Sequence, residues 1–163
     1  MGLVIRPAYT STEAVRELFA EYTQMLVAGD AAFQKYLDIQ NYAHELENLA
    51  EKYGQPWGRL CLAEWDGELA GCVALRRLDT RRCELKRLYV RPKFRGRGIG
   101  RALTEEMIRA ARDIGYREML LDTLPFLESA LHMYRGMGFQ EIGCYNDSPV
   151  DTTIFMRLEL NGI

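Results

Sequence analysis

Seven cationic side chains surround a run of three glycines in the middle of this chain. The cations are Lys86, Arg87, Arg91, Lys93, Arg95, Arg97 and Arg101, and the glycines are Gly96, Gly98 and Gly100. No acidic residue lies between Leu85 and Thr104. The whole chain has a formal net charge of −2, and its remaining 14 basic and 23 acidic residues sum to −9. A basic segment in an acidic chain indicates one local anionic ligand rather than a general affinity for polyanions.

The glycine run joins a predicted strand to a predicted helix. After it, apolar residues recur at the spacing of one helix face, at Ile99, Leu103, Met107, Ala110 and Ile114. The first N–H groups of a helix have no partner inside the helix, and its N-terminus carries a positive partial charge. Glycines leave room for an anion there. We therefore predict a phosphate cradle made of backbone N–H groups from about Arg97 to Arg101.

Two common phosphate-binding patterns are absent from this turn. The dinucleotide fingerprint needs a third glycine where Arg101 stands, and the Walker pattern is missing. What remains is Arg95-x-x-Gly98-x-Gly100, which resembles the acyl-CoA signature of the GNAT superfamily of N-acetyltransferases. The resemblance continues through the preceding strand and on to Tyr134-x-x-x-Gly138-Phe139. It covers residues 58 to 160 well and the first 55 residues poorly.

This resemblance implies that acetyl-CoA is the acyl donor and that no metal is used. It places the pyrophosphate at Arg95, Gly96, Arg97, Gly98, Ile99, Gly100 and Arg101. In this fold the preceding strand splays from its neighbour, so its free backbone would pair with the pantetheine arm along Leu88, Tyr89 and Val90. Many family members carry an asparagine where this chain has Leu127, so that pantetheine contact is not expected here.

Two catalytic residues are expected from the same resemblance. Glu84 stands at the position of a general-base glutamate and would take the amine proton through a water. Its alternative role is an ion pair with a nearby arginine such as Arg82. Tyr134 fits a tyrosine near the CoA sulfur, where a protonated phenol would donate to the departing thiolate. Its alternative role is that of a core aromatic.

We expect one domain over residues 1–163, with an α/β (α+β) fold and a mixed, mostly antiparallel sheet flanked by helices on both faces. The predicted order is β-α-α-β-β-β-α-β-α-β-β. The first helix should end at Gly29 and the second should run from Tyr36 to Tyr53. The later elements are strands 60–65, 69–75 and 83–90, the helix that opens at the cradle, strand 119–121, a helix starting at Pro125, and strands 139–142 and 154–160.

Composition and cysteine placement indicate the cellular compartment and the kinds of partner to expect. No apolar run is long enough to span a bilayer, and the first residues lack the apolar core of a signal peptide. The four cysteines, Cys61, Cys72, Cys83 and Cys144, form no C-x-x-C pair and lie in or beside strand-like runs. We therefore predict buried free thiols in a reducing cytoplasm, with no membrane partner. The basic segment lacks the interleaved aromatics of a nucleic-acid surface, so no nucleic-acid partner is expected.

The favoured function is transfer of an acetyl group from acetyl-CoA to a primary amine by direct attack, without a covalent intermediate. The alternative is a non-catalytic acyl-CoA-binding or regulatory domain of the same fold. Residues 30 to 68 hold eight acids and three bases, which form either a solvated surface or an acidic wall for a cationic amine; the solvated surface is favoured. The sequence leaves open the acceptor, a small molecule or a peptide amine, the acyl length, and whether the protein forms a homodimer.

Overall fold

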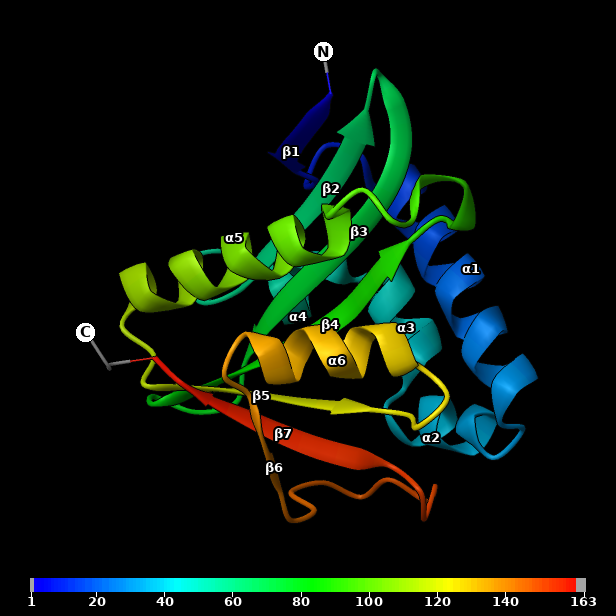
Figure 1. Cartoon of the computed structure of the whole chain (residues 1–163), viewed down its shortest axis with the longest axis vertical. Coiled ribbons are helices and arrows are strands. Elements are labelled where there is room, and N and C mark those ends of the chain that lie inside the picture. Colours follow the sequence, from blue (N-terminus) through cyan, green and yellow to red (C-terminus); the bar gives the residue numbers. More distant parts are fainter. Residues whose placement is uncertain (1, 161–163) are drawn as a thin grey trace.

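The computed structural model describes residues 2–160, which form one seven-stranded sheet with helices packed on both of its faces (Figure 1). The strand order is β1-β2-β3-β4-β5-β7-β6. The elements are β1 (Leu3–Pro7), α1 (Thr12–Gly29), α2 (Phe33–Ile39), α3 (Tyr42–Glu47), α4 (Leu49–Tyr53), β2 (Arg59–Trp65), β3 (Glu68–Arg77), β4 (Arg82–Val90), the 3-10 turn η1 (Pro92–Phe94), α5 (Ile99–Ile114), β5 (Glu118–Thr123), α6 (Glu128–Gly136), β6 (Gln140–Ile142) and β7 (Ile154–Glu159). The predicted fold class is confirmed.

The pairing of β4 with β5 is short and is the one parallel pairing in the sheet of the described chain. It covers Arg82 with Glu118, Cys83 with Met119 and Glu84 with Leu120. Beyond Glu84, β4 stays paired with β3 as far as Val90 but no longer with β5. The two strands therefore separate toward their carboxyl ends, as the family resemblance predicts.

A β-bulge in β4 lies at the start of this separation. Lys86 pairs with Ala74 and Tyr89 with Cys72, so two residues, Arg87 and Leu88, oppose a single residue of β3. Arg87 has a φ of 59°, in the left-handed region that a non-glycine residue rarely adopts. The bulge changes the direction of β4 where it leaves β5.

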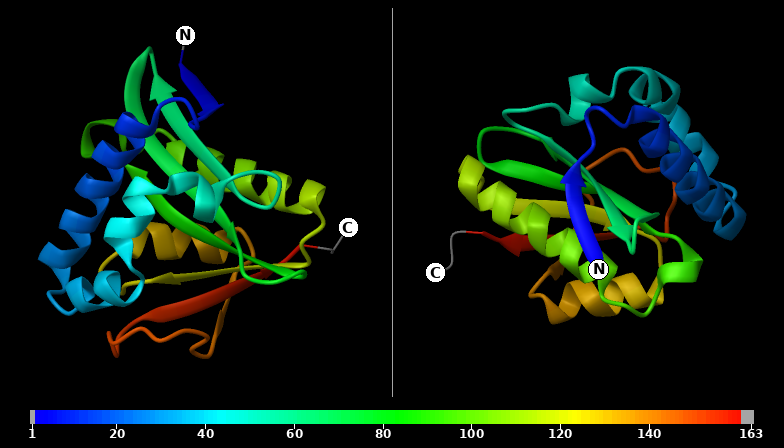
Figure 2. Two further views of the ribbon diagram at one scale, coloured as in Figure 1. Left: turned by 180° about the vertical axis from the view of Figure 1, so that it is seen from behind. Right: turned by 90° about the horizontal axis from the view of Figure 1, so that it is seen from above.

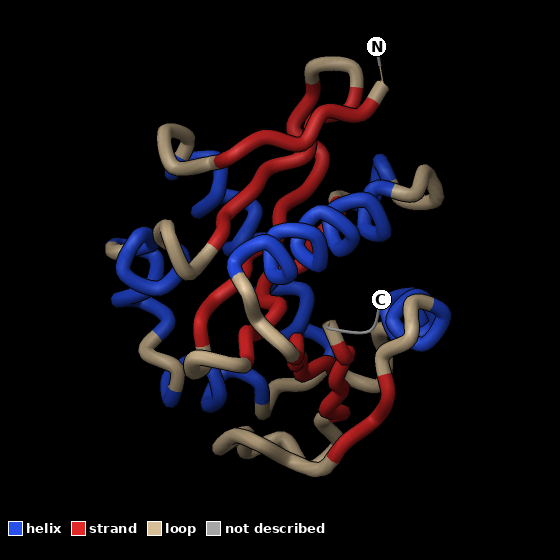
Figure 3. The backbone as a smooth tube through the Cα atoms, turned by 90° about the vertical axis from the view of Figure 1, so that its left-hand side faces the viewer, coloured by secondary structure: helices blue, strands red, loops and turns tan. Residues whose placement is uncertain are grey.

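The two faces of the sheet carry different helices (Figures 2 and 3). On one face α5 and α6 pack on apolar side chains that include Leu85 of β4 and Leu121 of β5. On the other face α1 and α4 pack on side chains that include Leu62 of β2 and Ala74 of β3. Because successive side chains of a strand point to opposite faces, the neighbours of Leu85 and Leu121 belong to the α1 face.

Three local predictions are wrong. The helix predicted to start at Pro125 begins at Glu128. The second helix, predicted from Tyr36 to Tyr53, is divided into α2, α3 and α4. Asn41 breaks it with a left-handed φ of 56°, and Asn48 breaks it again with a φ of −133° and a ψ of 52°, outside the helical region. Asparagine accepts such conformations because its short amide bonds to nearby backbone. Cys144 is exposed, since it follows the end of β6 in an irregular connection, whereas the other three thiols are buried.

A buried ion pair fixes the bulge to the divided helices. Glu45 of α3 is 3% exposed and accepts hydrogen bonds from Arg87 Nε and Nη2, both at 2.9 Å. Lys52 Nζ donates to the same carboxylate at 2.7 Å. The Arg87 guanidinium also lies over the Tyr42 ring, 5.1 Å from its centroid, and donates to Gln40 Oε1 at 2.8 Å. These contacts stabilise the left-handed backbone at Arg87.

We predict that Glu45→Gln lowers the free energy of unfolding by about 2–3 kcal/mol at pH 7, because it leaves a buried guanidinium without its anion. Burial opposes ionisation of Glu45, but Arg87 and Lys52 lower its pKa to about 2. A lowered pKa stabilises the fold above the unfolded value near 4.5, and this stabilisation is lost as pH falls from about 4.5 toward 2. Urea unfolding at pH 7 and between pH 5 and 2.5 measures both effects.

The matched control is Glu47→Gln, since Glu47 is exposed on the same helix. It should change the free energy of unfolding little. Equal loss in the two variants, or an unchanged slope of stability against pH in Glu45→Gln, would contradict the assigned role of the buried pair.

Candidate active site

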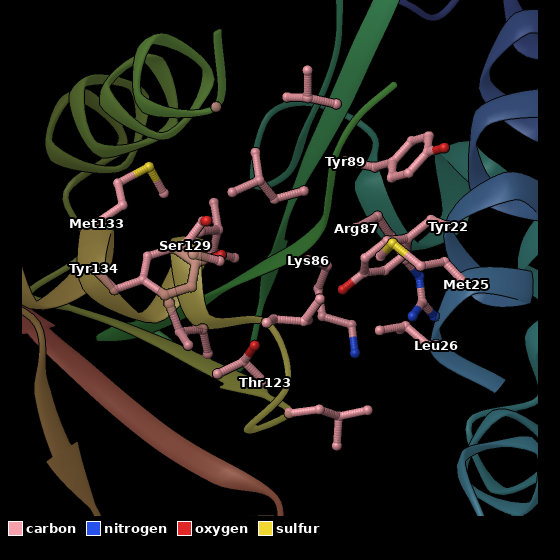
Figure 4. Close-up of a pocket in the computed structure, with 18 of the residues that line it drawn as sticks. Tyr22, Met25, Leu26, Lys86, Arg87, Tyr89, Thr123, Ser129, Met133 and Tyr134 are labelled. Carbon is pink, nitrogen blue, oxygen red and sulfur yellow. The ribbon is translucent and has the colours of Figure 1, made fainter. Parts of the chain in front are cut away.

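A cavity of about 500 Å³ lies where β4 and β5 separate. Its walls come from β4, β5, the glycine turn, α6, α1 and the α2 region. Figure 4 shows Ser129, Met133 and Tyr134 on one side of this cavity and Tyr22, Met25 and Leu26 on the other. The cavity therefore reaches both faces of the sheet through the gap between the two strands.

The glycine turn has the backbone geometry that a phosphate cradle requires. None of the backbone N–H groups from Gly96 to Arg101 donates to an acceptor within residues 2–160. Gly96 and Gly98 have left-handed φ values of 79° and 76°, and a Cβ added at either would meet no atom within 4 Å. Six successive free N–H groups at the start of a 16-residue helix suit a phosphorylated ligand. The residues present fit the pyrophosphate of acetyl-CoA.

Most of the basic segment is neutralised within the protein. Five of its seven cations lie within 4 Å of a carboxylate: Lys86 of Glu84, Arg87 of Glu45, Arg91 of Glu17 and Glu21, Lys93 of Glu68, and Arg101 of Glu105. In the described residues Arg95 and Arg97 have no such partner. The cationic charge available to an anion at the cradle is therefore smaller than the sequence indicates.

The predicted donor-site residues gather at the cavity, with one exception. Leu88, Tyr89, Val90, Arg95, Gly96, Gly98, Ile99, Gly100 and Arg101 line it. Arg95 Nε donates to the carbonyl of Val90 at 3.0 Å, which joins the turn to the end of β4. Arg97 does not line the cavity; its guanidinium lies over the Trp65 ring, 5.1 Å from the centroid. Leu127 also lines the cavity.

Tyr134 lines the cavity from α6 and is 5% exposed. Burial raises the pKa of its phenol above the ordinary value of 10, and nearby Tyr22 and Asp122 raise it further. Within residues 2–160, its hydroxyl makes no hydrogen bond to a protein group. A protonated phenol that is free of protein partners can donate a proton into the cavity.

Glu84 lies on the α1 face and does not line the cavity. It is 2% exposed and accepts hydrogen bonds from Arg76 Nε at 2.8 Å and from the Tyr145 hydroxyl at 2.5 Å. Arg76 is its cross-strand neighbour on β3. The sequence-based alternative partner, Arg82, pairs instead with Asp79 at 2.7 Å. Glu84 is thus next to the cavity wall rather than in it.

Two strand residues of the cavity wall, Asp122 and Lys86, are not placed there by the sequence; the exposed Glu128 of α6 also lines the cavity. Asp122 of β5 accepts hydrogen bonds on Oδ2 from Asn146 Nδ2 at 2.7 Å and from the Tyr36 hydroxyl. Lys86 belongs in sequence to the basic segment, but it lines the cavity from the opposite face of β4. Strand alternation around Leu85 and Leu121 would have placed both residues on the α1 face.

The acidic region between residues 30 and 68 does not form a wall of this cavity. None of its eight acids lines the cavity. Glu45, the one among them that is buried, is neutralised by Arg87 and Lys52. Within the described part of the chain there is also no group of three or more His, Cys, Asp or Glu side chains that could hold a metal ion, and no helix there is long and apolar enough to cross a membrane.

Comparison with known proteins finds N-acetyltransferases. A family model described as "Acetyltransferase (GNAT) family" matches residues 12–139. An uncharacterised N-acetyltransferase of Schizosaccharomyces pombe is 39% identical over 127 residues, which cover 77% of this chain and 78% of that protein. The uncharacterised N-acetyltransferase YjgM of Escherichia coli is 31% identical over 71% of this chain and 72% of that protein.

Solved structures show the same fold. A GNAT-family acetyltransferase of Staphylococcus aureus superposes with a TM-score of 0.77 at 23% identity, covering 98% of this chain and 99% of that one. The PaiA N-acetyltransferase of Thermoplasma acidophilum, solved in complex with coenzyme A, superposes with a TM-score of 0.73 at 18% identity, covering 98% and 99%.

Proposed function

This chain belongs to the acetyltransferase (GNAT) family, and on that premise we propose that it transfers the acetyl group of acetyl-CoA to a primary amine by direct attack. The observation that carries the proposal is the row of free N–H groups from Gly96 to Arg101 beside the gap between β4 and β5. The cradle and Arg95 would hold the pyrophosphate. Leu88, Tyr89 and Val90 would lie along the pantetheine arm.

The proposed step needs two proton movements. The amine nitrogen forms a bond to the acetyl carbon, and the bond from that carbon to sulfur breaks. An alkyl ammonium, with a pKa of about 10, loses one proton before attack and a second as the amide forms. One proton ends on the CoA thiolate and the other leaves to solvent. No covalent bond to the protein is required.

We propose that the Tyr134 hydroxyl, which is protonated, free of protein partners and inside the cavity, donates its proton to the departing thiolate. Tyr134 regains a proton from the second one that the amine nitrogen loses as the amide forms. We propose that Glu84 accepts the first proton of the amine through an intervening water. Because Glu84 lies outside the cavity wall, this transfer requires a relay. Asp122 lines the wall directly and is the competing candidate for the base.

We predict that Glu84→Gln lowers turnover most at neutral pH, and that the loss shrinks as the pH approaches the amine's own pKa. Gln keeps the size of Glu84 but cannot take a proton. The pH dependence of kcat is the measurement, with Asp122→Asn assayed beside it. A pH-dependent loss in Asp122→Asn alone would move the base to β5. A loss in Glu84→Gln that is equal at every pH would mean that Glu84 only holds Arg76 and Tyr145 in place.

The rival prediction, a non-catalytic acyl-CoA-binding domain, is disfavoured by the family match and by the free Tyr134 hydroxyl in the cavity. A screen of small amines and peptide amines, with acetyl-CoA as donor and detection of the released thiol, tests the proposed function. Acetylation of at least one amine is expected. Binding of acetyl-CoA without turnover of any amine across pH 6 to 9 would favour the rival.

A further inference from the structure

The half of the cavity on the α1 face holds a cation, Lys86, and an anion, Asp122, that form no ion pair with each other. The last paired residues of β4 and β5 are Glu84 and Leu120. Continued in the same register, Lys86 would stand opposite Asp122, on the same face of the sheet. Side chains opposite each other in a continuous sheet lie close enough to form an ion pair. Among the described residues Lys86 and Asp122 form none, because the strands have separated at this level.

The Lys86 ammonium has capacity for a further partner. It is 7% exposed, and its Nζ donates to Gln40 Oε1 at 3.1 Å. The nearest carboxylate oxygen is Glu84 Oε1, at 3.8 Å, and that oxygen already accepts a hydrogen bond from Arg76. An ammonium has three donors, and one hydrogen bond accounts for only one of them. Figure 4 shows the Lys86 nitrogen in the open part of the cavity, between the α6 side and the α1 side.

The Asp122 carboxylate is also incompletely satisfied. Both of its protein hydrogen bonds, from Tyr36 and Asn146, go to Oδ2 and come from neutral groups. Within residues 2–160, no hydrogen bond reaches Oδ1 and no cation lies within 4 Å of the carboxylate. Asp122 also raises the pKa of Tyr134, so its charge acts at the hydroxyl proposed to protonate the thiolate.

We propose that the acceptor is an amine that carries a carboxylate close by, as an α-amino acid does. Its carboxylate binds Lys86, and its amino group lies at Asp122, whose charge acts on Tyr134. In this arrangement Asp122, the competing candidate for the base, is the carboxylate beside the amine. A zwitterion of this kind fills the gap between the two strands, gives Asp122 a cation and gives Lys86 a second carboxylate besides that of Glu84. The inference rests on the proposed function, since it names the class of acceptor.

Pairs of acceptors that differ only in the carboxylate test this proposal on the wild-type protein. Each of the twenty common amino acids is compared with its carboxamide, which keeps the amine and the side chain but removes the negative charge. We expect at least one acid whose kcat/KM exceeds that of its amide by about tenfold to a hundredfold, the contribution of one charge-assisted hydrogen bond. Amides that are acetylated as well as their acids across the whole set would overturn the inference and leave the proposed function intact.

The Lys86→Gln variant then tests whether Lys86 causes the preference for the amino acid over its carboxamide. It should raise KM for the acid about tenfold or more and leave the amide unchanged, so the preference is lost. Lys35→Gln is the control, since Lys35 is exposed on α2 and outside the cavity. An equal effect of Lys86→Gln on acid and amide would show that Lys86 holds the strands rather than the acceptor.

A binding measurement separates this inference from the proposed reaction. Calorimetric titration with N-acetyl-leucine and with N-acetyl-leucinamide requires no turnover. Tighter binding of the acid to the wild-type protein, lost in Lys86→Gln, supports the carboxylate site even if no amine is acetylated. Equal binding of the two compounds to the wild-type protein overturns it.

Discussion

A Gly98→Asp variant should no longer bind acetyl-CoA. Gly98 is the N-cap of α5, with a left-handed φ of 76°, and a Cβ at this position would project into open space at the cradle. The aspartate places a negative charge where a phosphate oxygen must approach and competes for the free N–H groups of the following residues. Calorimetric titration of the wild-type protein should show binding, and the variant should show no heat at millimolar ligand.

Two further variants separate charge from backbone strain. Gly67 lies in the turn between β2 and β3, has a φ of 85°, and also has open space at its Cβ position. Gly67→Asp therefore imposes a comparable strain and charge outside the cavity, and it should bind acetyl-CoA normally. Gly98→Asn keeps the size of aspartate without the charge and should retain more affinity than Gly98→Asp. Normal binding by Gly98→Asp would remove the cradle from the proposed function.

The geometry of the glycine turn could be predicted because its signals are local. Glycines at the start of a clear helical period specify a left-handed turn and free N–H groups within a few residues, whatever the rest of the fold does. The separation of β4 from β5 could not be predicted from local signals, since nothing in the composition of either strand indicates where their pairing stops. That expectation came from family resemblance, and the register ending at Glu84 agrees with it.

The bulge at Arg87 had no signal in the sequence. An arginine does not favour a positive φ, and its left-handed backbone is stabilised by a carboxylate 42 residues away. Partners that are distant in sequence also explain why the sequence overestimates the free positive charge of the basic segment. Arg91, for example, pairs with Glu17 and Glu21 of α1, partners that reading the local sequence cannot supply.

The two residues that we propose for the acceptor are hard to recognise in the sequence for a different reason. Lys86 was grouped with its sequence neighbours, although strand alternation separates it from Leu85 and turns it to the other face. Asp122 is a carboxylate within an apolar strand, which is itself a signal of a functional position because burying an unpaired carboxylate is costly. Both residues could have been found by applying the strand period to every charged residue.

Tyr134→Phe should lower kcat by about 10² to 10⁴, the usual cost of losing one general acid, while the affinity for acetyl-CoA stays nearly unchanged. The phenyl ring keeps its packing against Phe139, whose centroid lies 5.4 Å away, and only the hydroxyl is lost. Because burial raises the pKa of Tyr134 above 10, the phenol stays protonated across pH 6 to 9, and the ratio of the two rates should be constant over that range. Steady-state kinetics and calorimetry on both proteins measure kcat and the affinity for acetyl-CoA.

Tyr116→Phe is the control, since the Tyr116 hydroxyl donates to the Trp57 carbonyl at 2.7 Å and Tyr116 does not line the cavity. The kcat of this variant should match the wild type. If Tyr134→Phe also turned over at the wild-type rate, the thiolate would have to leave without help from this hydroxyl, and α6 would contribute only the wall of the cavity.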